Sequence, residues 1–430
     1  MLDIKLIRSN PDFVKNGLQR RGRDYGKEID EVLKIDQQRR EINSEADKLR
    51  CEQNAANNEI VRMKKADQGT EEIMVRMKQI SDLLKGLSKD IAELEESQNN
   101  LIYSLPNLPH ESVPAGVDES ENKEIRRWGE PRKFSFEPSS HWDLGAKLGI
   151  IDPVRAAKVV GSRFHYYIGL GSRLERAITN FYLDTHMKRG YKEIFSPFIA
   201  NQASMLGTGQ LPKFAEDMFK LEGLDYYLIP TAEIPLTNFH RDEVLTKDEL
   251  PIKYCGYTAC FRAEAGSAGK DTRGLIRQHQ FNKVELVKFV SPESSYEELE
   301  SLTNDAEHVL QLLGLPYRVI SLCGGDLGAN SAKTYDIEVW MPSYDRYVEI
   351  SSCSNFEDFQ ARRANIKFKE SAEEKAKLVH TLNGSGVAVG RTFAAILENF
   401  QNEDGSVDVP EVLRGYMQEN VIAVSAQGPT

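Results

Sequence analysis

Apolar residues recur at coiled-coil spacing in two stretches between residues 29 and 101. The first repeats every seven positions, at Ile35, Ile42, Leu49, Ala56 and Met63. The second alternates steps of four and three, at Ile73, Met77, Ile80, Leu84, Leu87, Ile91, Leu94 and Leu101, with an interruption at Gln98. Such spacing keeps one apolar stripe on each helix. Between the stretches, Gly69 offers a helix stop and Thr70 an N-cap. We therefore predict two long helices that fold back antiparallel.

Prolines mark the end of this helical pair. Leu105-Pro106-Asn107-Leu108-Pro109 cannot continue a helix, because proline lacks a donor and clashes with the preceding turn. We place the boundary near residues 105–112, which predicts a first domain over residues 1–110 and a second over residues 111–430. Residues up to about 170 are rich in proline, serine and charge and are predicted to form an ordered irregular connection.

Two segments in the second domain alternate as strands do. Phe261–Glu264 and Arg277–Glu285 are joined by a loop with Gly266, Gly269 and Gly274. If they pair antiparallel in the right register, one face of the hairpin carries Arg262, Glu264, Phe281, Lys283 and Glu285. A guanidinium binds phosphate, an aromatic ring stacks on a base, and carboxylates accept from amino groups. This face predicts a nucleotide site. A solvated hairpin with cross-strand ion pairs is the alternative, and the commoner one for the pattern alone.

Composition and charge narrow the class of protein. With 430 residues, 40% hydrophobic and 28% charged, the chain suits a globular protein of two or three domains. No apolar run approaches a membrane span, and the N-terminus lacks the apolar stretch of a signal peptide, so we expect a cytoplasmic protein. Five scattered cysteines without a CxxC pair argue against a disulfide framework and a zinc site.

The net charge of −11 does not by itself suggest a nucleic-acid partner. Residues 1–100 contain 19 Lys and Arg against 20 Asp and Glu, so the acidity lies almost entirely in the remainder. Basic residues of the helical pair are candidate phosphate contacts, although they could equally pair with neighbouring acids. The pattern alone is more typical of a dimerisation or spacer coiled coil.

Three further segments carry candidate chemistry. Thr231 and Glu233 lie between two prolines and could orient an ammonium, although an ordinary turn is the commoner explanation. Glu349 and Ser352, in a strand-like segment, offer the hard oxygen ligands that Mg²⁺ prefers, or else a capped strand end. Arg391 follows Gly384, Gly386 and Gly390 in the first turn of a predicted helix, where free backbone N–H groups favour anions.

The motifs together resemble a known family. "FRAE", a loop and "RQHQFNKVE" resemble the second signature motif of class II aminoacyl-tRNA synthetases, and "GLIRQHQFNKVELV" resembles the bacterial-type seryl-tRNA synthetases. The likeness covers nearly the whole chain, through "MLDIKLIRSNPDFV", "RFHYYIGLGSRLERAI", "PTAEIPLTN", "EISSCSNFEDFQARR", "TLNGSGVAVGRTFAAILENFQ" and "DGSVDVPEVLRGYM". It implies an α+β fold, with an N-terminal antiparallel two-helix coiled coil on a class II body whose central antiparallel sheet is flanked by helices.

The resemblance also implies a function. Serine would be activated with ATP to seryl-adenylate, with Mg²⁺, and then transferred to tRNA(Ser) bound by the N-terminal arm, with tRNA(Sec) as a second candidate acceptor. Residues 174–187 and 189–197 resemble the first class II motif, which implies a homodimer. Two alternatives stay open: a related ATP-dependent enzyme that loads an activated amino acid onto another acceptor, and an inactive coiled-coil assembly protein.

Site residues follow from the resemblance, position by position. Arg262 would hold the α-phosphate, Phe281 would stack on adenine, Glu264 would contact the adenine end and Arg391 would bind the γ-phosphate; Arg262 and Arg391 are the catalytic pair. The ATP site would also include Ala263, Arg277, Glu349, Ile350, Ser351 and Ser352, of which Glu349 and Ser352 hold Mg²⁺. The serine site would comprise Thr231, Ala232, Glu233, Arg262, Glu285, Asn383 and Ser385.

Overall fold

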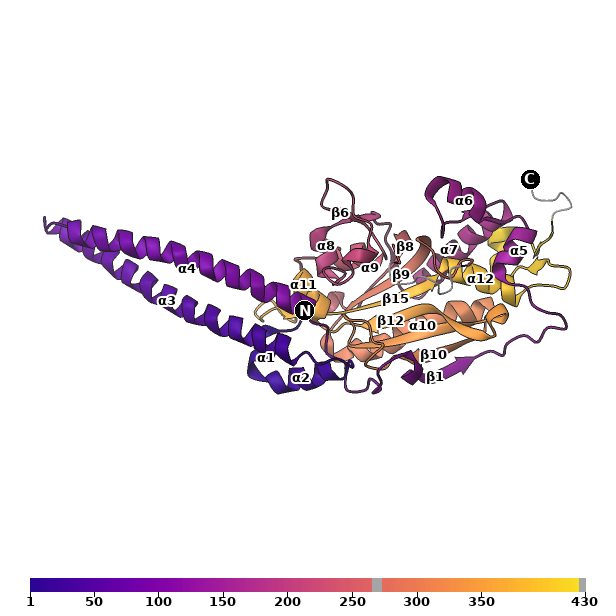
Figure 1. The fold of residues 1–430 in the computed structure, drawn as a ribbon, viewed down its shortest axis with the longest axis horizontal. Coiled ribbons are helices and arrows are strands. Elements are labelled where there is room, and N and C mark those ends of the chain that lie inside the picture. The colour runs from indigo at the N-terminus through magenta and orange to yellow at the C-terminus, as the bar shows by residue number, and fades with distance from the viewer. Residues whose placement is uncertain (265–272, 425–430) are drawn as a thin grey trace. The chain divides into compact units, whose positions relative to one another are not determined.

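The computed structural model describes residues 1–264 and 273–424 and separates into two compact units. The helical unit comprises Leu2–Gln19 and Arg23–Pro106. The sheet unit comprises Met1, Arg20–Gly22 and the residues from Asn107 onward. Figure 1 labels those of their helices and strands for which there is room.

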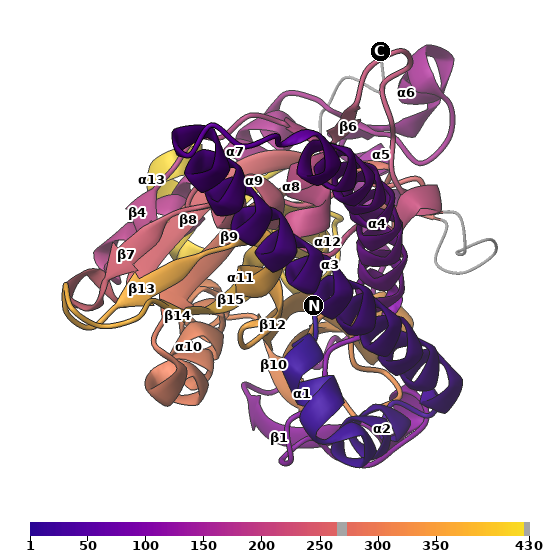
Figure 2. The ribbon, with the colours of Figure 1, turned by 90° about the vertical axis from the view of Figure 1, so that its left-hand side faces the viewer.

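The helical unit is dominated by two long antiparallel helices. Its elements are α1 (Ile4–Ser9), α2 (Pro11–Gln19), α3 (Gly26–Lys65) and α4 (Glu71–Ser104). Figures 1 and 2 both show α3 and α4 side by side. The predicted seam residues are buried or half-buried, whereas most of their neighbours are exposed. The 40 residues of α3 extend for about 60 Å at 1.5 Å per residue. The predicted helical hairpin is therefore confirmed.

Gln98, which interrupts the apolar repeat, has a buried polar partner. The Asp36 side chain is 1% exposed and accepts two hydrogen bonds from Arg8, at 2.7 and 2.9 Å. Arg40 Nε donates to the same carboxylate at 3.1 Å, and Gln98 Nε2 lies 3.5 Å from Asp36 Oδ1. A buried carboxylate needs such donors, so a polar residue at this seam position is explained.

The turn between α3 and α4 differs from the prediction. The left-handed residue is Asp67, with φ 56°, and not Gly69. Gln68 N–H donates to Met63 O at 3.0 Å, which is the hydrogen bond that closes a Schellman motif. Thr70 makes no side-chain capping bond. Aspartate is one of the few residues that tolerate the left-handed region, so the helix ends before the glycine.

An eight-stranded sheet forms the centre of the second unit, in the order β1-β10-β11-β12-β15-β9-β8-β4. Neighbouring strands pair antiparallel, except that β4 pairs parallel with β8. The strands are β1 (Lys123–Trp128), β10 (Tyr317–Ser321), β11 (Lys333–Met341), β12 (Arg346–Asn355), β15 (His380–Ala388), β9 (Gln280–Val290), β8 (Ile252–Phe261) and β4 (Lys192–Glu193). The segment expected to be irregular thus supplies an edge strand, β1.

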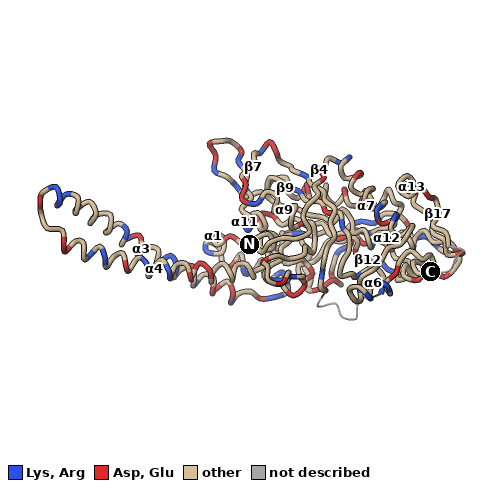
Figure 3. The backbone as a smooth tube through the Cα atoms, turned by 90° about the horizontal axis from the view of Figure 1, so that it is seen from above, with Lys and Arg blue, Asp and Glu red and all other residues tan. Residues whose placement is uncertain are grey.

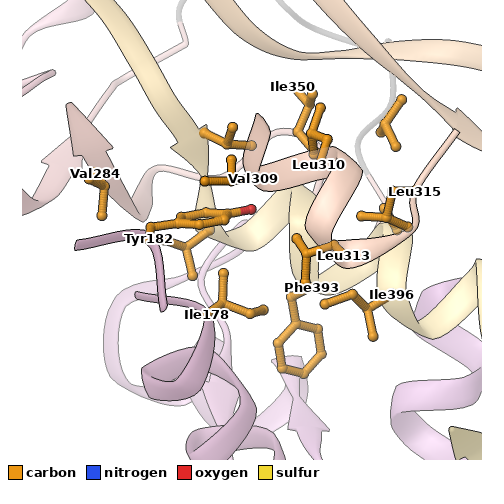
Figure 4. Packing of buried hydrophobic residues seen from close by; sticks show 14 of the residues in the cluster. Ile178, Tyr182, Val284, Val309, Leu310, Leu313, Leu315, Ile350, Phe393 and Ile396 are labelled. Atoms are coloured by element: carbon orange, nitrogen blue, oxygen red, sulfur yellow. The ribbon is translucent and has the colours of Figure 1, made fainter. Parts of the chain in front are cut away.

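Three helices pack against one face of this sheet, namely α7 (Leu170–Lys188), α10 (Ser295–Leu313) and α12 (Val389–Asn399). Their apolar side chains share one buried cluster with residues of the strands. Figure 4 shows Tyr182 of α7, Leu310 of α10 and Phe393 of α12 with Val284 of β9 and Ile350 of β12. Val284 and Leu286 belong to this cluster, so the odd-numbered side chains of this part of β9 face the other way.

Shorter elements complete the unit. The helices are α5 (His141–Lys147), α6 (Pro153–Val160), α8 (Gln202–Gly207), α9 (Glu233–Asn238), α11 (Phe359–Ala364) and α13 (Glu411–Met417). The remaining strands are β2 (Ile151–Asp152), β3 (Tyr166–Tyr167), β5 (Ile199–Asn201), β6 (Tyr226–Leu228), β7 (Val244–Thr246), β13 (Lys367–Lys369), β14 (Lys377–Leu378), β16 (Val407–Asp408) and β17 (Val421–Ile422). Within the described residues, no helix is long and apolar enough to cross a membrane.

Candidate active site

The β8/β9 hairpin has the register that places the predicted residues on one face. Cys260 is opposite Phe281 and Thr258 is opposite Lys283. The pairing continues one step beyond β8, because Arg262 N–H donates to His279 O at 2.9 Å. Arg262 therefore shares a face with Phe281 and Lys283, and its guanidinium carbon lies 5.2 Å from the centre of the Phe281 ring. A cation and an aromatic plate thus stand together.

Glu264 lines the site, although it is not part of the strand whose alternation predicted its position. It lies beyond the end of β8, with φ 51°, so the expected continuation of the strand is wrong at this residue. Its Oε2 lies 3.2 Å from Arg277 Nη1, and both side chains line the site. Ala263 N–H donates to Asp217 O at 2.9 Å. Of the loop glycines, Gly274 has φ 69°, whereas Gly266 and Gly269 lie outside the described residues.

Buried carboxylates form one end of the site. Thr231 Oγ1 donates to Glu285 Oε2 at 2.9 Å, and Glu285 is 1% exposed. Lys283 Nζ forms an ion pair with the same Glu285 oxygen. The segment 229–235 is not the predicted strand and turn throughout, because α9 begins at Glu233. Ala232 is buried among apolar residues.

Glu233 has its own set of partners. Its Oε1 accepts from Gln360 Nε2 at 2.6 Å, and the Gln360 Oε1 accepts from Thr381 Oγ1 at 2.7 Å. Gln360 Nε2 also donates to Thr208 O at 3.2 Å, and because a carbonyl oxygen can only accept, this bond fixes which end of the Gln360 amide faces Glu233. Burial, with a smaller contribution from the Glu285 charge, raises the pKa of Glu233 to about 7. Near neutral pH this carboxyl can therefore gain or lose its charge.

Glu349 and Ser352 share a face because of a β-bulge. Residues three apart on a regular strand point to opposite faces. In the β11/β12 pair the register shifts, so that Glu338 is opposite Glu349 while Ile337 is opposite Ser351. The extra residue, Ile350, returns Ser352 to the Glu349 face. Ser351 is 1% exposed and its Oγ donates to Ser385 O at 2.6 Å.

These two oxygen ligands suit a hard divalent cation. The Glu349 side chain is 49% exposed and lines the same cavity as Ser352. Desolvation raises the pKa of Glu349, but the nearby Arg391 and Arg262 outweigh it and hold that pKa below its ordinary value. Residues 1–264 and 273–424 contain no group of three or more His, Cys, Asp or Glu side chains arranged to hold a metal. Glu349 and Ser352 therefore fit Mg²⁺ only as part of a shell that water and phosphate complete.

The strand β15 and helix α12 close the site. Ser385 is directly opposite Glu285, and Asn383 is opposite Ser354 of β12. Val387, between the glycines, has φ 96°, so a non-glycine residue holds a left-handed backbone where the β15/β9 register shifts, just before α12. Arg391 lies in the first turn of α12; its Nη1 donates to Glu349 O at 2.6 Å and lies 3.5 Å from Glu349 Oε1.

A cavity joins these residues. A pocket of about 680 Å³ contains most of the predicted serine residues: Thr231, Glu233, Arg262, Glu285, Asn383 and Ser385, together with Glu264, Arg277, Glu349 and Ser352. A smaller adjoining pocket is lined by Arg262, Glu264, Ile276, Arg277, Phe281, Glu349, Ile350 and Arg391, among others. Ala232, Ala263 and Ser351 line neither pocket with their side chains. Sequence patterns placed Lys283, which lines both pockets, on the predicted face without giving it a role of its own, and they gave no sign of Gln360 behind Glu233.

Comparisons with known proteins agree with this arrangement. Residues 1–109 match the model of the seryl-tRNA synthetase N-terminal domain, and residues 218–400 match the tRNA synthetase class II core domain (G, H, P, S and T). A serine–tRNA ligase of Carboxydothermus hydrogenoformans is 62% identical, over 97% of this chain and 98% of its own. The chain belongs to the seryl-tRNA synthetases. It is thus an aminoacyl-tRNA synthetase, a ligase that joins serine to tRNA.

Solved structures of seryl-tRNA synthetases have the same fold. The enzyme from Pyrococcus horikoshii, complexed with ATP, has a TM-score of 0.92 and is 40% identical, covering 99% of this chain and 100% of its own. A cytoplasmic enzyme from Naegleria fowleri, in complex with AMP, has a TM-score of 0.87 at 31% identity and covers 99% of both chains. The predicted family and fold class are confirmed.

Proposed function

We propose that this synthetase performs both steps of serine–tRNA ligation with the residues of the sheet face described above. ATP binds with its base on Phe281, its α-phosphate at Arg262 and its γ-phosphate at Arg391. The cation–aromatic pair of Arg262 and Phe281, 5.2 Å apart, is the observation that carries this assignment. It gives a stacking surface next to a phosphate-binding guanidinium, and the synthetases complexed with ATP and AMP share the fold.

The buried carboxylates bind serine. Glu285, with Thr231 and the opposing Ser385, presents oxygens that recognise the ammonium and hydroxyl groups of serine. Glu233 contributes a second carboxylate. A site that hydrogen-bonds a hydroxyl leaves buried polar groups unpaired when that hydroxyl is missing, which is how serine is told from alanine.

Positioning and charge stabilisation account for the first step. A serine carboxylate oxygen attacks the α-phosphorus, and the bond to the pyrophosphate breaks in line. Glu349 and Ser352 would hold Mg²⁺, which neutralises phosphate charge when bound. Arg262 and Arg391 meet the charge that spreads over the phosphates, and no protein nucleophile is needed.

The second step uses the helical unit. The α3/α4 hairpin binds tRNA(Ser), and tRNA(Sec) is a further candidate acceptor. Figure 3 shows basic and acidic residues mixed along the hairpin, so a set of phosphate contacts separated by acids would bind without indiscriminate attraction to RNA. We also propose a cytoplasmic homodimer. Phe195, after β4, is 79% exposed and Met187 of α7 is 39% exposed, which suits an interface formed by the segment 174–197.

A charging assay tests the proposal. The chain is incubated with ATP, bulk bacterial tRNA and each of the twenty amino acids in turn, and pyrophosphate exchange is measured in parallel without tRNA. Serine alone should support both reactions. Exchange without charging would indicate a different acceptor, and neither reaction with any amino acid would indicate an inactive assembly protein.

A further inference from the structure

Lys283 stands where the two parts of the site meet. Along one face of β9, the side chains of Phe281, Lys283 and Glu285 follow at intervals of two residues. Among the described residues, those lining both pockets are Arg262, Glu264, Arg277, Lys283, Glu349 and Ser385. Lys283 is 6% exposed, and its ammonium is paired with Glu285.

The position of Lys283 along the strand indicates which group of the substrates it would contact. Two residues of a strand span about 7 Å, so Lys283 lies about that far from each neighbour on its face. In the proposed function, ATP lies on the Phe281 side and the serine ammonium on the Glu285 side. The group between them is the serine carboxylate, where it meets the α-phosphate. An unpaired carboxylate brought beside phosphates in an enclosed site would be strongly disfavoured.

The ion pair also matches serine as a zwitterion. Lys283 and Glu285 carry opposite charges side by side on one strand face. Serine carries an ammonium and a carboxylate on one carbon. If serine lies along this pair, its ammonium satisfies Glu285 while its carboxylate satisfies Lys283, so that each buried charge keeps a partner.

We propose that Lys283 is a catalytic residue that binds the carboxylate of serine and holds it for attack on ATP. This inference rests on the proposed serine site. In the reaction, a carboxylate oxygen forms a bond to the α-phosphorus, the bond from that phosphorus to the bridging oxygen breaks, and its electron pair leaves with pyrophosphate. Lys283 supplies charge and orientation and transfers no proton.

Serinol, which has the ammonium and hydroxyl groups of serine but no carboxylate, separates this role from a structural one. Binding of serine and of serinol is measured by calorimetry for the full chain and for Lys283→Met. The variant should bind serine about tenfold to hundredfold more weakly, the range for losing a charged hydrogen bond. Serinol should bind equally well or better, because a cation near its own ammonium has gone.

Two further variants serve as controls. Lys283→Arg keeps the charge and should recover part of the preference for serine over serinol. Lys288→Met removes another buried ammonium of β9, on the opposite face, where Lys288 Nζ lies 2.8 Å from Glu298 Oε2. It should leave the ratio of the two affinities unchanged, even if thermal unfolding shows lost stability.

Specific outcomes would overturn the inference. If Lys283→Met weakens serine and serinol by the same factor, Lys283 only maintains Glu285. Unchanged serine binding would exclude any contact with the carboxylate. Failure of the proposed serine site itself would look different, because Glu285→Gln would then leave the binding of both ligands intact.

Discussion

The α3/α4 hairpin and the polar face of the central sheet use hydrophobic periodicity in opposite ways. In the hairpin, apolar seam residues stabilise the pair of helices and the polar residues are mostly exposed. In the sheet, Val284 and Leu286 of β9 pack on α7, α10 and α12, while Lys283 and Glu285 on the other face are charged and yet buried. Charges on the hairpin are therefore largely solvated and individually replaceable, whereas those on the sheet face are desolvated and interdependent.

The difference explains where single substitutions should matter. Arg76 and Glu52 pair across the hairpin at 3.1 Å, with side chains 67% and 49% exposed. Such a pair contributes little to stability or binding. By contrast, the buried carboxylate of Glu285 is bonded to both Lys283 and Thr231. Changing any one of these three residues therefore alters the environment of the other two.

The largest expected effect concerns the choice of amino acid, which should depend on the sheet face and not on the hairpin. Buried partners of the serine hydroxyl would be left unpaired by alanine, so we expect alanine to be rejected by about 10⁴-fold or more in kcat/KM for pyrophosphate exchange. The test measures pyrophosphate exchange with serine and with alanine, both on the full chain and on a chain with a shortened hairpin. Alanine within about a hundredfold of serine would show that the pocket is misassigned.

The two arginines proposed to bind the ATP phosphates should show the second-largest effect. Arg262→Ala and Arg391→Ala should each slow adenylate formation by about 10²- to 10³-fold, the range for removing one preorganised donor. Arg76→Ala, on the hairpin, is the matched control and should leave pyrophosphate exchange unchanged. An unimpaired Arg262 or Arg391 variant would remove the basis for assigning that residue to ATP.

The Glu233 carboxyl should make the activity of the sheet face depend on pH. Its pKa is raised to about 7, so the charged form, which binds the serine ammonium in the proposed serine site, is lost as pH falls through that value. In the free enzyme, kcat/KM for serine should therefore rise with pH through about 7. Glu233→Gln should lose this rise and lower kcat/KM by about thirty- to hundredfold. A variant that retains the same pH dependence would assign it to another group.

Asp36 is the exception within the hairpin and should have the smallest effect. Burial is the largest single influence and raises its pKa, but Arg8, Gln98 and Arg40 together outweigh burial and lower the pKa below its ordinary value. Because the pKa is lower in the folded state than in the unfolded state, the ionised carboxylate stabilises the fold at pH values above the unfolded-state pKa. This stabilisation is lost as the pH falls through the folded-state pKa. Asp36→Asn should lower the protection of α3 and α4 from hydrogen exchange by about 1–2 kcal/mol at neutral pH. It should not alter pyrophosphate exchange, and full protection in the variant would contradict the role of the carboxylate.

Much of the hairpin was predictable from sequence because its information is local. Seven-residue spacing alone located both helices and their shared seam. The turn was less predictable, since the left-handed position could be filled by Asp67 or by Gly69. The partner of Gln98 could not be predicted either, because Asp36 is 62 positions away in the chain.

The polar face required information that local patterns do not contain. Alternation placed Arg262 with Phe281 once the register was known, but it could not reveal that Glu264 leaves the strand. The bulge at Ile350 decides whether Glu349 and Ser352 share a face, and no local signal announces it. Gln360 lies 127 positions from Glu233, so the contact appears only in the folded chain.

Shortening the hairpin tests most directly whether the sheet face forms seryl-adenylate while the hairpin serves tRNA binding. Replacing residues 43–91 with a short Gly/Ser turn retains Asp36, Gln98 and the 3.0 Å pair of Arg39 and Glu95, so the base of the hairpin keeps its contacts. The shortened chain should make seryl-adenylate at the full-length rate. Its kcat/KM for charging tRNA(Ser) should fall sharply, with a weaker dependence on salt, because phosphate contacts that position the acceptor are lost. Equal charging by the two chains would contradict this account and leave the hairpin as a spacer or an assembly element.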